Sequence, residues 1–328
     1  MNILAFNLYI APVLEFVGQL VEPTPEVKDT IVWALRRVAP GPGNWITQRD
    51  LENLCCLGFN QEFRCIEHSA RAAKLRVARD LVPNAIELKD ALVMAFLEAD
   101  HRTLGAWFRH CFTYILGSNF QARSPRAIEA ATKNCTQAEL VSLVKAEQKP
   151  YDAESRIRQK IQRWRFNEPP ALAARHIQAN LGVLRKTCRP CVVSAVVRTL
   201  WNGWPTSARM RSLNQQASGL CVFGCKHAED RVEHYLLCDV TWHFLSRPVP
   251  QGLGLRQSMR NLQAMMLADK DMDTRELVGV AVGIYAASRA VQQIKASHAA
   301  LQPTPLLRLY AAEGMRGAKR RTTQNDRA

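Results

Sequence analysis

Residues 221–238 read Cys221-Val-Phe-Gly-Cys225-Lys-His-Ala-Glu-Asp-Arg-Val-Glu-His234-Tyr-Leu-Leu-Cys238, which is a C-x3-C-x8-H-x3-C array. Its spaced positions are soft nitrogen and sulfur donors, a set that favours zinc over magnesium or calcium. Gly224 lets the backbone turn tightly between the first two cysteines. His234 and Cys238 are four residues apart, so on a helix they share one face. We therefore expect one structural Zn²⁺, held by four protein ligands with no open coordination position.

Two alternatives to this ligand set stay open. The cysteines could be plain core residues beside an exposed histidine, although the intervening Lys226, Glu229, Asp230 and Arg231 make the stretch polar for a simple core segment. His227 and His243 compete with His234 as the nitrogen ligand, and the four-residue spacing to Cys238 favours His234.

The rest of the chain has an almost wholly helical pattern. The first helix should bend at Pro12, and Thr47 with Asp50 resembles a capping box before an apolar run. The fold class that we predict is mainly α, with a multi-helix domain and a small CCHC zinc-knuckle module. The predicted helices cover residues 2–21, 24–38, 47–58, 61–82, 84 or 87 to 99, 103–116, 124–146, 152–166, 171–184, 192–201, 255–267 and 274–299.

Charge is distributed unevenly along the 328 residues. Residues 1–150 hold 17 Lys/Arg against 16 Asp/Glu, whereas residues 151–328 hold 27 against 13. Within residues 156–220 there are 12 basic residues and one acidic residue, a balance of +11. Clustered basic side chains displace the counterions condensed on phosphates, so we expect RNA or DNA as the partner. A basic surface that serves only solubility is the alternative.

Residues 155–165 contain the densest group of basic side chains in this region. Ile157, Ile161 and Trp164 recur at helical spacing and should face the core, which leaves a single-signed basic surface. A merely solvated face usually mixes both signs, so we expect phosphate contacts here. The candidate nucleic-acid-binding residues are Arg156, Arg158, Lys160, Arg163, Arg165, Arg185, Lys186, Arg209 and Arg211.

Two further motifs admit more than one interpretation. Cys188-Arg-Pro-Cys191 lacks the βαβ context of a redox motif, so structural cysteines are favoured over a second metal half-site. Trp201-Asn-Gly-Trp204 is either a base-stacking platform or, as is more usual at a helix end, a pair of packing residues.

The chain shows neither an export signal nor catalytic motifs. Residues 1–22 contain no basic residue, and polar residues and Pro12 interrupt their apolar run, which argues against a secretory signal and a membrane span. We therefore expect reduced thiols and a location in the nucleus or cytoplasm, with no membrane partner. No two aspartates are adjacent, so a paired-aspartate metal site for polymerisation is not expected.

The charge and motifs divide the chain into five predicted segments. They are a helical domain over 1–150, a basic helical linker over 151–215, the zinc knuckle over 216–245, C-terminal helices over 246–300 and a basic flexible tail over 301–328. Lys149-Pro150 marks the first boundary because the charge balance changes there.

Four segments carry a resemblance to the C-terminal part of non-LTR retrotransposon reverse transcriptases. They are Phe16-Val-Gly-Gln-Leu-Val-Glu-Pro23, Val38-Ala-Pro-Gly-Pro-Gly-Asn-Trp45, Trp201-Asn-Gly-Trp204 and the cysteine/histidine array. The resemblance implies the end of the palm and a helical thumb over 1–150, then a basic linker over 151–215 and a knuckle over 221–238 that contact RNA or DNA. The fingers, palm and endonuclease of that family are missing, and its His-to-Cys spacer is commonly four residues rather than three.

The resemblance implies a binding fragment of the RNA-directed DNA polymerase family that has no polymerase activity alone. Whether it works with a separate polymerase partner stays open. Two other interpretations also stay open: a zinc-stabilised protein–protein interaction module derived from a retroelement, and a truncated product without function.

Overall fold

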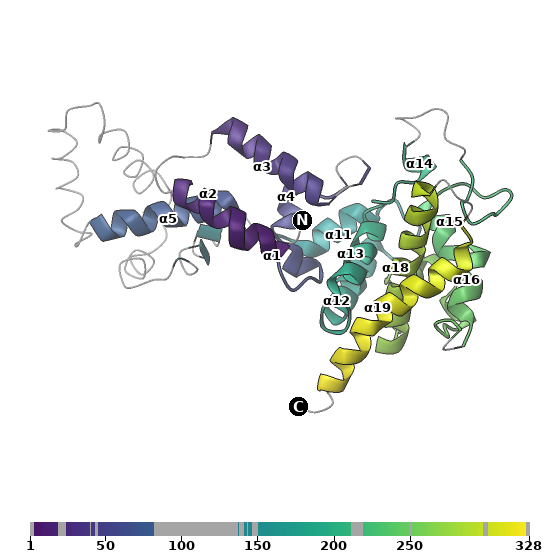
Figure 1. Ribbon diagram of the computed structural model, residues 1–328. Helices are drawn as coiled ribbons and strands as arrows, with labels where there is room; N and C mark the ends of the chain where they lie inside the picture. Colours follow the sequence, from purple (N-terminus) through teal and green to yellow (C-terminus); the bar gives the residue numbers. More distant parts are fainter. Residues whose placement is uncertain are drawn as a thin grey trace. The chain divides into compact units, whose positions relative to one another are not determined.

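The computed structural model describes the chain in several stretches and is mainly helical (Figure 1). No strand occurs among the described residues, where one isolated antiparallel bridge joins Leu220 and Glu229. The mainly α class predicted from the sequence is therefore confirmed. The described residues are 3–18, 24–39, 41–42, 45–81, 137, 141–142, 144–145, 150–210, 219–248, 251–297 and 301–325.

Contacts divide the chain into two compact units that differ from the predicted segments. Unit 1 comprises Met1–Val38 and Phe63–Tyr151, and unit 2 comprises Ala39–Glu62 and Asp152–Ala328. Residues 39–62 thus join the C-terminal half, and the predicted linker, knuckle and C-terminal helices belong to one unit. The reason is that residues 39–62 contact residues more than 100 positions later in the chain, such as Arg156 and Lys160.

The first helical rod of unit 1 is irregular at the predicted proline. It runs through α1 (Ile3–Ala5), the π-helical η1 (Phe6–Ile10) and α2 (Ala11–Gly18). The Ala11 amide donates to the Phe6 carbonyl, a bond one residue longer than in an α-helix. Because the ring of Pro12 clashes with a regular preceding turn and offers no N–H, a π-helical turn absorbs the mismatch.

The other described helices of unit 1 are α3 (Pro25–Val38) and α5 (Ile66–Leu81). α2 packs against α5, and the rings of Phe6 and Phe63 meet edge to face with centroids 5.2 Å apart. α3 matches its predicted bounds, whereas α5 begins five residues later than predicted. The predicted helices over 84–99 and 103–116 lie outside the described residues, as does most of that over 124–146.

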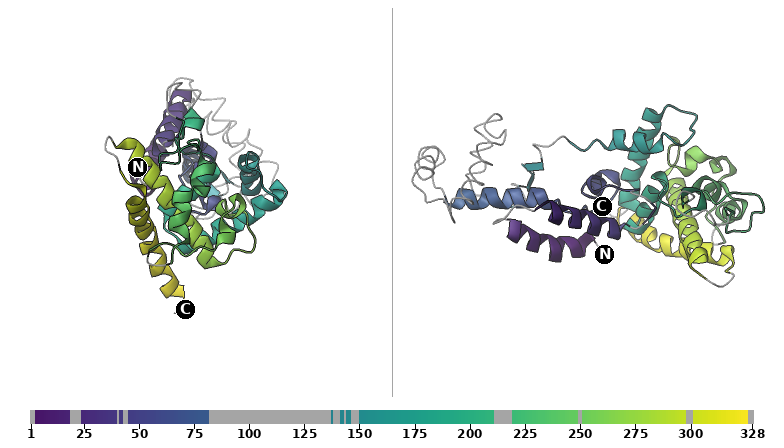
Figure 2. Two further views of the ribbon diagram at one scale, coloured as in Figure 1. Left: turned by 90° about the vertical axis from the view of Figure 1, so that its right-hand side faces the viewer. Right: turned by 90° about the horizontal axis from the view of Figure 1, so that it is seen from above.

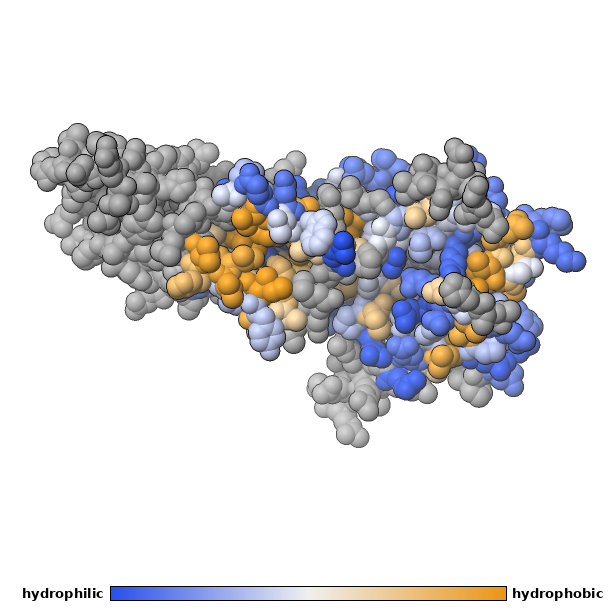
Figure 3. All heavy atoms as spheres, turned by 45° about the horizontal axis from the view of Figure 1, so that its top comes forward, coloured by the Kyte–Doolittle hydropathy of each residue, from blue (hydrophilic) through white to orange (hydrophobic). Residues whose placement is uncertain are grey.

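Unit 1 exposes large apolar side chains on η1, α2 and α3. Tyr9 is 74% exposed, Phe16 66% and Val13 61%, and Trp33 on α3 is exposed as well. Figure 3 shows an apolar patch over these N-terminal helices. Scattered single apolar residues are ordinary on protein surfaces, but a contiguous group indicates a contact surface.

Unit 2 is organised around one long helix, α18. It buries 14 of its 23 residues and packs against helices on several sides. By length and composition α18 could cross a membrane, but 78% of its most apolar window is buried inside the protein, as in a core helix. The elements of unit 2 are α4 (Gln48–Leu51), η2 (Leu54–Leu57), α11 (Ala153–Ile161), α12 (Pro170–Thr187), α13 (Pro190–Leu200), α14 (Ser207–Met210), α15 (Val232–Leu237), α16 (Asp239–Ser246), η3 (Gln257–Met259), α17 (Leu262–Met265), α18 (Thr274–Ala296) and α19 (Pro303–Asn325).

Small residues on α18 allow its neighbours to approach closely. A Cβ atom at Gly283 would lie 2.6 Å from a methyl carbon of Leu245, and one at Gly279 would lie 2.8 Å from a methyl carbon of Leu255. Both distances are far below van der Waals contact, so a larger residue at either position would displace the end of a leucine side chain.

The C-terminal segment differs from the predicted flexible tail. Residues Pro303–Asn325 form α19, which packs against α18, and Figure 2 shows it in yellow against the green helices of unit 2. Leu307, Tyr310 and Ala311 are buried and recur at the three- and four-residue spacing of one helical face. This apolar stripe packs α19 against the protein. The expectation of a flexible tail rested on the basic composition of the segment and did not take the stripe into account.

Several other predicted helices also have different bounds in the structure. The helix predicted over 47–58 is divided into α4 and η2, and the helices predicted over 171–184 and 192–201 are Pro170–Thr187 and Pro190–Leu200. α11 ends at Ile161 rather than 166, yet Ile157, Ile161 and Trp164 are all buried as predicted. Residues 255–267 form the short elements η3 and α17 instead of one helix, because Asn261 adopts an extended conformation and caps α17 by accepting from the Ala264 amide.

An ion pair joins residues 39–62 to the rest of unit 2. The predicted capping box is present, since Thr47 accepts from the Asp50 amide and the Asp50 side chain accepts from the Thr47 amide. Asp50 also accepts two hydrogen bonds from Arg156, at 2.9 and 2.7 Å. Asp50 is 1% exposed, so its charge depends on this guanidinium.

We expect Asp50→Ala to lower the free energy of unfolding of unit 2 by about 3–5 kcal/mol, because it leaves the charge of Arg156 without its partner. The measurement is denaturant unfolding followed by helical circular dichroism. Arg158→Gln, an exposed change on the same helix, is the control and should stay within about 0.5 kcal/mol. Equal stability of the two variants would contradict this role for Asp50.

Candidate functional site

The first two cysteines of the array lie on a small hairpin-like loop. The Cys221 amide donates to the Ala228 carbonyl at 2.9 Å, and the Asp230 amide donates to the Gly219 carbonyl at 2.7 Å. Gly224 has a φ of +91° between the cysteines, a left-handed conformation that glycine adopts without steric penalty. The tight turn predicted at this glycine is confirmed.

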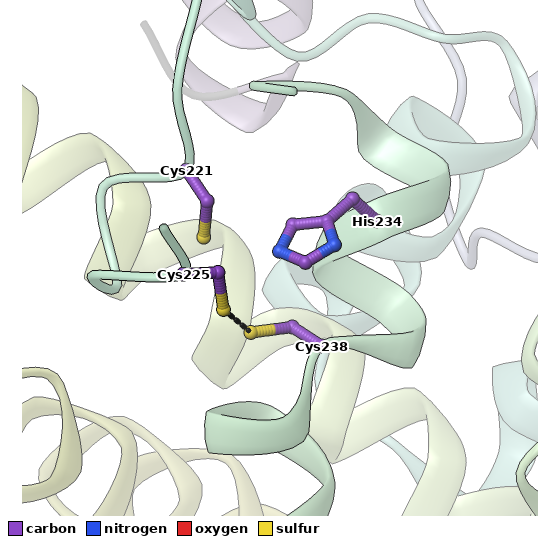
Figure 4. A group of neighbouring side chains, drawn as sticks. All are labelled: Cys221, Cys225, His234 and Cys238. Atoms are coloured by element: carbon purple, nitrogen blue, oxygen red, sulfur yellow. Dashed lines mark hydrogen bonds between the residues drawn. The ribbon is translucent and has the colours of Figure 1, made fainter. Parts of the chain in front are cut away.

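The other two members of the array come from consecutive short helices. His234 lies on α15, and Cys238 lies at the junction where α15 ends and α16 begins. Their four-residue spacing brings both side chains to the side that faces the loop, as Figure 4 shows.

The four side chains converge on one point. Their ligand atoms all lie within 4.8 Å of one another, and the Cys225 and Cys238 sulfurs are 3.5 Å apart. A ring nitrogen of His234 points towards the sulfurs in Figure 4, and its Nε2 is buried without a hydrogen-bond partner. A buried polar atom without a partner is costly, and a metal ion at the centre of the cluster would satisfy it. The group can therefore hold a metal ion.

The surroundings of the cluster favour a thiolate at Cys238. A hydrogen bond from the Cys221 thiol lowers the pKa of Cys238 to about 5, and backbone amides of Thr241 and Val240 at the start of α16 act in the same direction. The same hydrogen bond, together with burial, raises the pKa of Cys221. Burial raises the pKa of Cys225 as well. Metal binding requires deprotonated sulfur, and these contacts favour deprotonation at one sulfur of the group.

A buried carboxylate, Asp230, holds the loop and α15 in place. Its oxygens accept from the Ser207 amide and hydroxyl, both at 2.6 Å, from Lys295 at 2.5 Å and from the Tyr235 hydroxyl at 2.8 Å. Burial opposes ionisation of Asp230, but the hydrogen bonds from Lys295, Ser207 and Tyr235 outweigh it and lower its pKa.

Tyr235 also holds the loop in place, through both its hydroxyl group and its ring. Its hydroxyl accepts from the Val222 amide at 3.1 Å, beside the first cysteine. Its ring stacks on Trp204 and meets Phe223 edge to face. The position of Cys221 is thus coupled to α15 through one side chain.

The competing ligands named from the sequence lie apart from the cluster. His227 is exposed, and His243 is an exposed residue of α16 whose ring contacts Arg247. Neither they nor Cys188 and Cys191 belong to a metal-holding group among the residues that the structure describes.

Four of the predicted nucleic-acid-binding residues have partners inside unit 2. Arg156 binds Asp50, and Lys160 donates to the Trp45 carbonyl at 3.0 Å. Burial lowers the pKa of Lys160 to about 8, with Arg156 acting in the same direction and Asp50 opposing it. Arg163 lies 3.7 Å from Glu233, and Arg185 donates to the Asn60 side chain. These contacts give Arg156, Lys160 and Arg185 a role in the packing of unit 2, whereas the side chain of Arg163 stays 41% exposed.

Four other predicted residues are free in the described part of the chain. Arg158, Arg165, Lys186 and Arg209 are exposed, and their side chains have no hydrogen-bond or ion-pair partner there. Arg211 lies outside the described residues.

Trp201 and Trp204 are packing residues. They are 3% and 1% exposed, and the Trp204 indole donates to the Thr199 hydroxyl at 2.8 Å. The stacking alternative requires an accessible ring face, so the burial of both rings excludes it.

Sequence reasoning missed the network around Asp230. Both Asp230 and Tyr235 lie inside the array, but ligand spacing carries no information about them. Lys295 follows Asp230 by 65 residues, and no local pattern links the two.

No protein-family model, curated protein or solved structure matches this chain.

We expect Asp230→Asn to lower the free energy of unfolding by about 3–5 kcal/mol, because the substitution leaves the charge of Lys295 without its counter-ion. Denaturant unfolding measures the change. Glu229→Gln removes an exposed neighbouring charge and should alter stability by less than about 1 kcal/mol. A loss for Asp230→Asn no larger than that control would show that the network contributes little.

Proposed function

We propose that this chain is a nucleic-acid-binding helical protein with one structural zinc ion. The observation that carries the proposal is the convergence of four soft ligands in the more basic unit of the chain. The zinc holds the loop and α15 together, and the free basic side chains contact phosphates.

Zinc is supported by the chemistry and spacing of the ligands. Three sulfurs and one imidazole form a tetrahedral set that zinc uses in structural sites, and bonds of about 2.3 Å would place the sulfurs about 3.8 Å apart. The observed separations of up to 4.8 Å need only small side-chain shifts to reach this geometry. With four protein ligands no position remains for substrate, so the zinc has a folding role.

Cys225→Ser should abolish stoichiometric metal binding, because one of four ligands is removed, and should unfold residues 216–245 while the distant helices remain. Apparent binding free energies of structural zinc are roughly 10–16 kcal/mol. The measurement is elemental analysis of the purified protein with circular dichroism. Cys56→Ser, an exposed cysteine outside the group, is the control. Full metal content in Cys225→Ser would move the site to other ligands, with His227 and Cys191 the first to test.

Nucleic acid as the partner is supported by charge that the fold leaves free. The segment 156–220 carries +11, and although several of its cations are used internally, Arg158, Arg165, Lys186 and Arg209 are exposed without partners in the described part of the chain. Phosphate contacts of this kind position a protein on nucleic acid without reading its bases. Binding is therefore proposed to be tolerant of sequence.

The resemblance gives this proposal a specific form. The chain is proposed to derive from the C-terminal region of a non-LTR retrotransposon reverse transcriptase and to bind RNA or DNA as the linker and knuckle of that family do.

A second candidate is a protein-interaction module. The observation that favours it is the exposed apolar patch on η1, α2 and α3 of unit 1. The two candidates differ in salt dependence, since phosphate binding weakens steeply as salt rises whereas an apolar interface does not.

Replacing Arg158, Arg165 and Lys186 by glutamine should weaken RNA or DNA binding, because each of these side chains would otherwise neutralise a phosphate. The slope of log K against log salt should fall by about one for every phosphate that is no longer neutralised. Fluorescence anisotropy with labelled oligonucleotides at several salt concentrations measures both effects. The matched control replaces Lys270, Arg275 and Arg308, which are also exposed but lie outside 156–220. Equal effects of the two triple variants would place the affinity in net charge alone.

A further inference from the structure

A polar pocket of about 290 Å³ lies beside the metal cluster in unit 2. Its wall includes Arg163 after α11, Asn202 and Thr206 after α13, Arg209 on α14, and Arg231 and Glu233 around the start of α15. Glu233 directly precedes the candidate ligand His234. The loop and helix that hold the metal ligands therefore also shape this pocket.

The pocket carries more positive than negative charge. Three arginines and one glutamate line it. Glu233 lies 3.7 Å from Arg163, and Arg231 pairs with Glu229. Arg209 has no side-chain partner in the described part of the chain. One full positive charge thus remains without an internal counter-ion.

The arginines are also close enough to oppose one another. Arg163 is held with its guanidinium over the Trp164 ring, 4.8 Å from the centroid, and the carboxamide of Asn202 lies within hydrogen-bond distance of the same guanidinium. Burial lowers the pKa of Arg163, Arg209 and Arg231 act in the same direction, and Glu233 opposes them. These arginines are held close to one another, so an anion bound between them would reduce their mutual repulsion.

The size and donors of the pocket indicate which anion fits. Small-molecule pockets typically measure about 300–1,000 Å³, so this one admits a single compact group. Arginine presents its N–H donors in a planar arrangement that matches phosphate oxygens. Arg163 and Arg209 line the cavity together with Arg231.

We propose that this pocket binds one phosphate group of the nucleic-acid backbone, with Arg209 and Arg163 as its main donors. This inference rests on the proposed function, and it assigns one of the phosphate contacts of nucleic-acid binding to this pocket. Glu233 limits the affinity by repelling the anion and by competing for Arg163.

The test compares two pocket variants with a matched control. Arg209→Gln removes the unpaired donor, Glu233→Gln removes the competing acid, and Arg275→Gln removes an exposed arginine elsewhere. One arm measures the affinity for a labelled 20-nucleotide RNA and its DNA counterpart across salt concentrations. The other measures the unfolding temperature with inorganic phosphate against chloride at equal ionic strength. Metal content is checked in every variant, because Glu233 adjoins His234.

We expect Arg209→Gln to weaken oligonucleotide binding about tenfold, as for loss of a charged hydrogen bond, and to reduce the salt slope by about one. Glu233→Gln should tighten binding several-fold, and Arg275→Gln should change it less than about twofold. Phosphate should raise the unfolding temperature of the wild type and of Glu233→Gln, and raise it less in Arg209→Gln.

The outcomes separate this inference from the proposed function. If the wild type binds oligonucleotides and Arg209→Gln matches Arg275→Gln in both arms, the pocket assignment is overturned and nucleic-acid binding stands. If no oligonucleotide binds but phosphate stabilises the protein through Arg209, the pocket is a site for a free phosphate compound. In that case the proposed function and the backbone assignment both fail. Absence of both effects overturns the two proposals together.

Discussion

The buried carboxylate of Asp230 is the constraint on which the candidate metal site depends. It joins the loop that carries Cys221 and Cys225, the short helix α14, the helix α15 and the central helix α18 through hydrogen bonds to Ser207, Tyr235 and Lys295. The Asp230 carboxylate is 1% exposed, and a charge buried in this way is stable only when its partners fully satisfy it. The four candidate metal ligands are therefore positioned by contacts with the core of unit 2.

A similar pair operates at another place in unit 2, where Asp50 is buried against Arg156. In a chain with an excess of cations, these two buried carboxylates each give a basic side chain a fixed partner. Basic residues near one another in sequence consequently have different roles. Arg156 and Lys160 hold the unit together, whereas Arg158 is directed to solvent and is free to meet a phosphate.

Much of the local structure could be predicted. The helical class, the bounds of α3, the capping box at Thr47, the buried face of Ile157, Ile161 and Trp164, and the turn at Gly224 all follow from short-range rules of periodicity and backbone conformation. The grouping of the four candidate metal ligands could also be predicted, because all of them lie within 18 residues of sequence. The ordered helix α19 was missed because basic composition was weighed above its apolar stripe. The single helix predicted over 255–267 failed because the capping preference of Asn261 prevailed over periodicity.

By itself, the sequence determined which side chains can hold a metal ion and where positive charge accumulates, because ligand type, spacing and net charge are local properties. Only the tertiary structure decided which cations remain free and which support the site. That division depends on contacts between residues far apart in the chain, such as Arg156 with Asp50 and Lys295 with Asp230. Burial decides which basic side chains are paired, because a buried carboxylate is stable only beside a partner and the fold determines which one lies near.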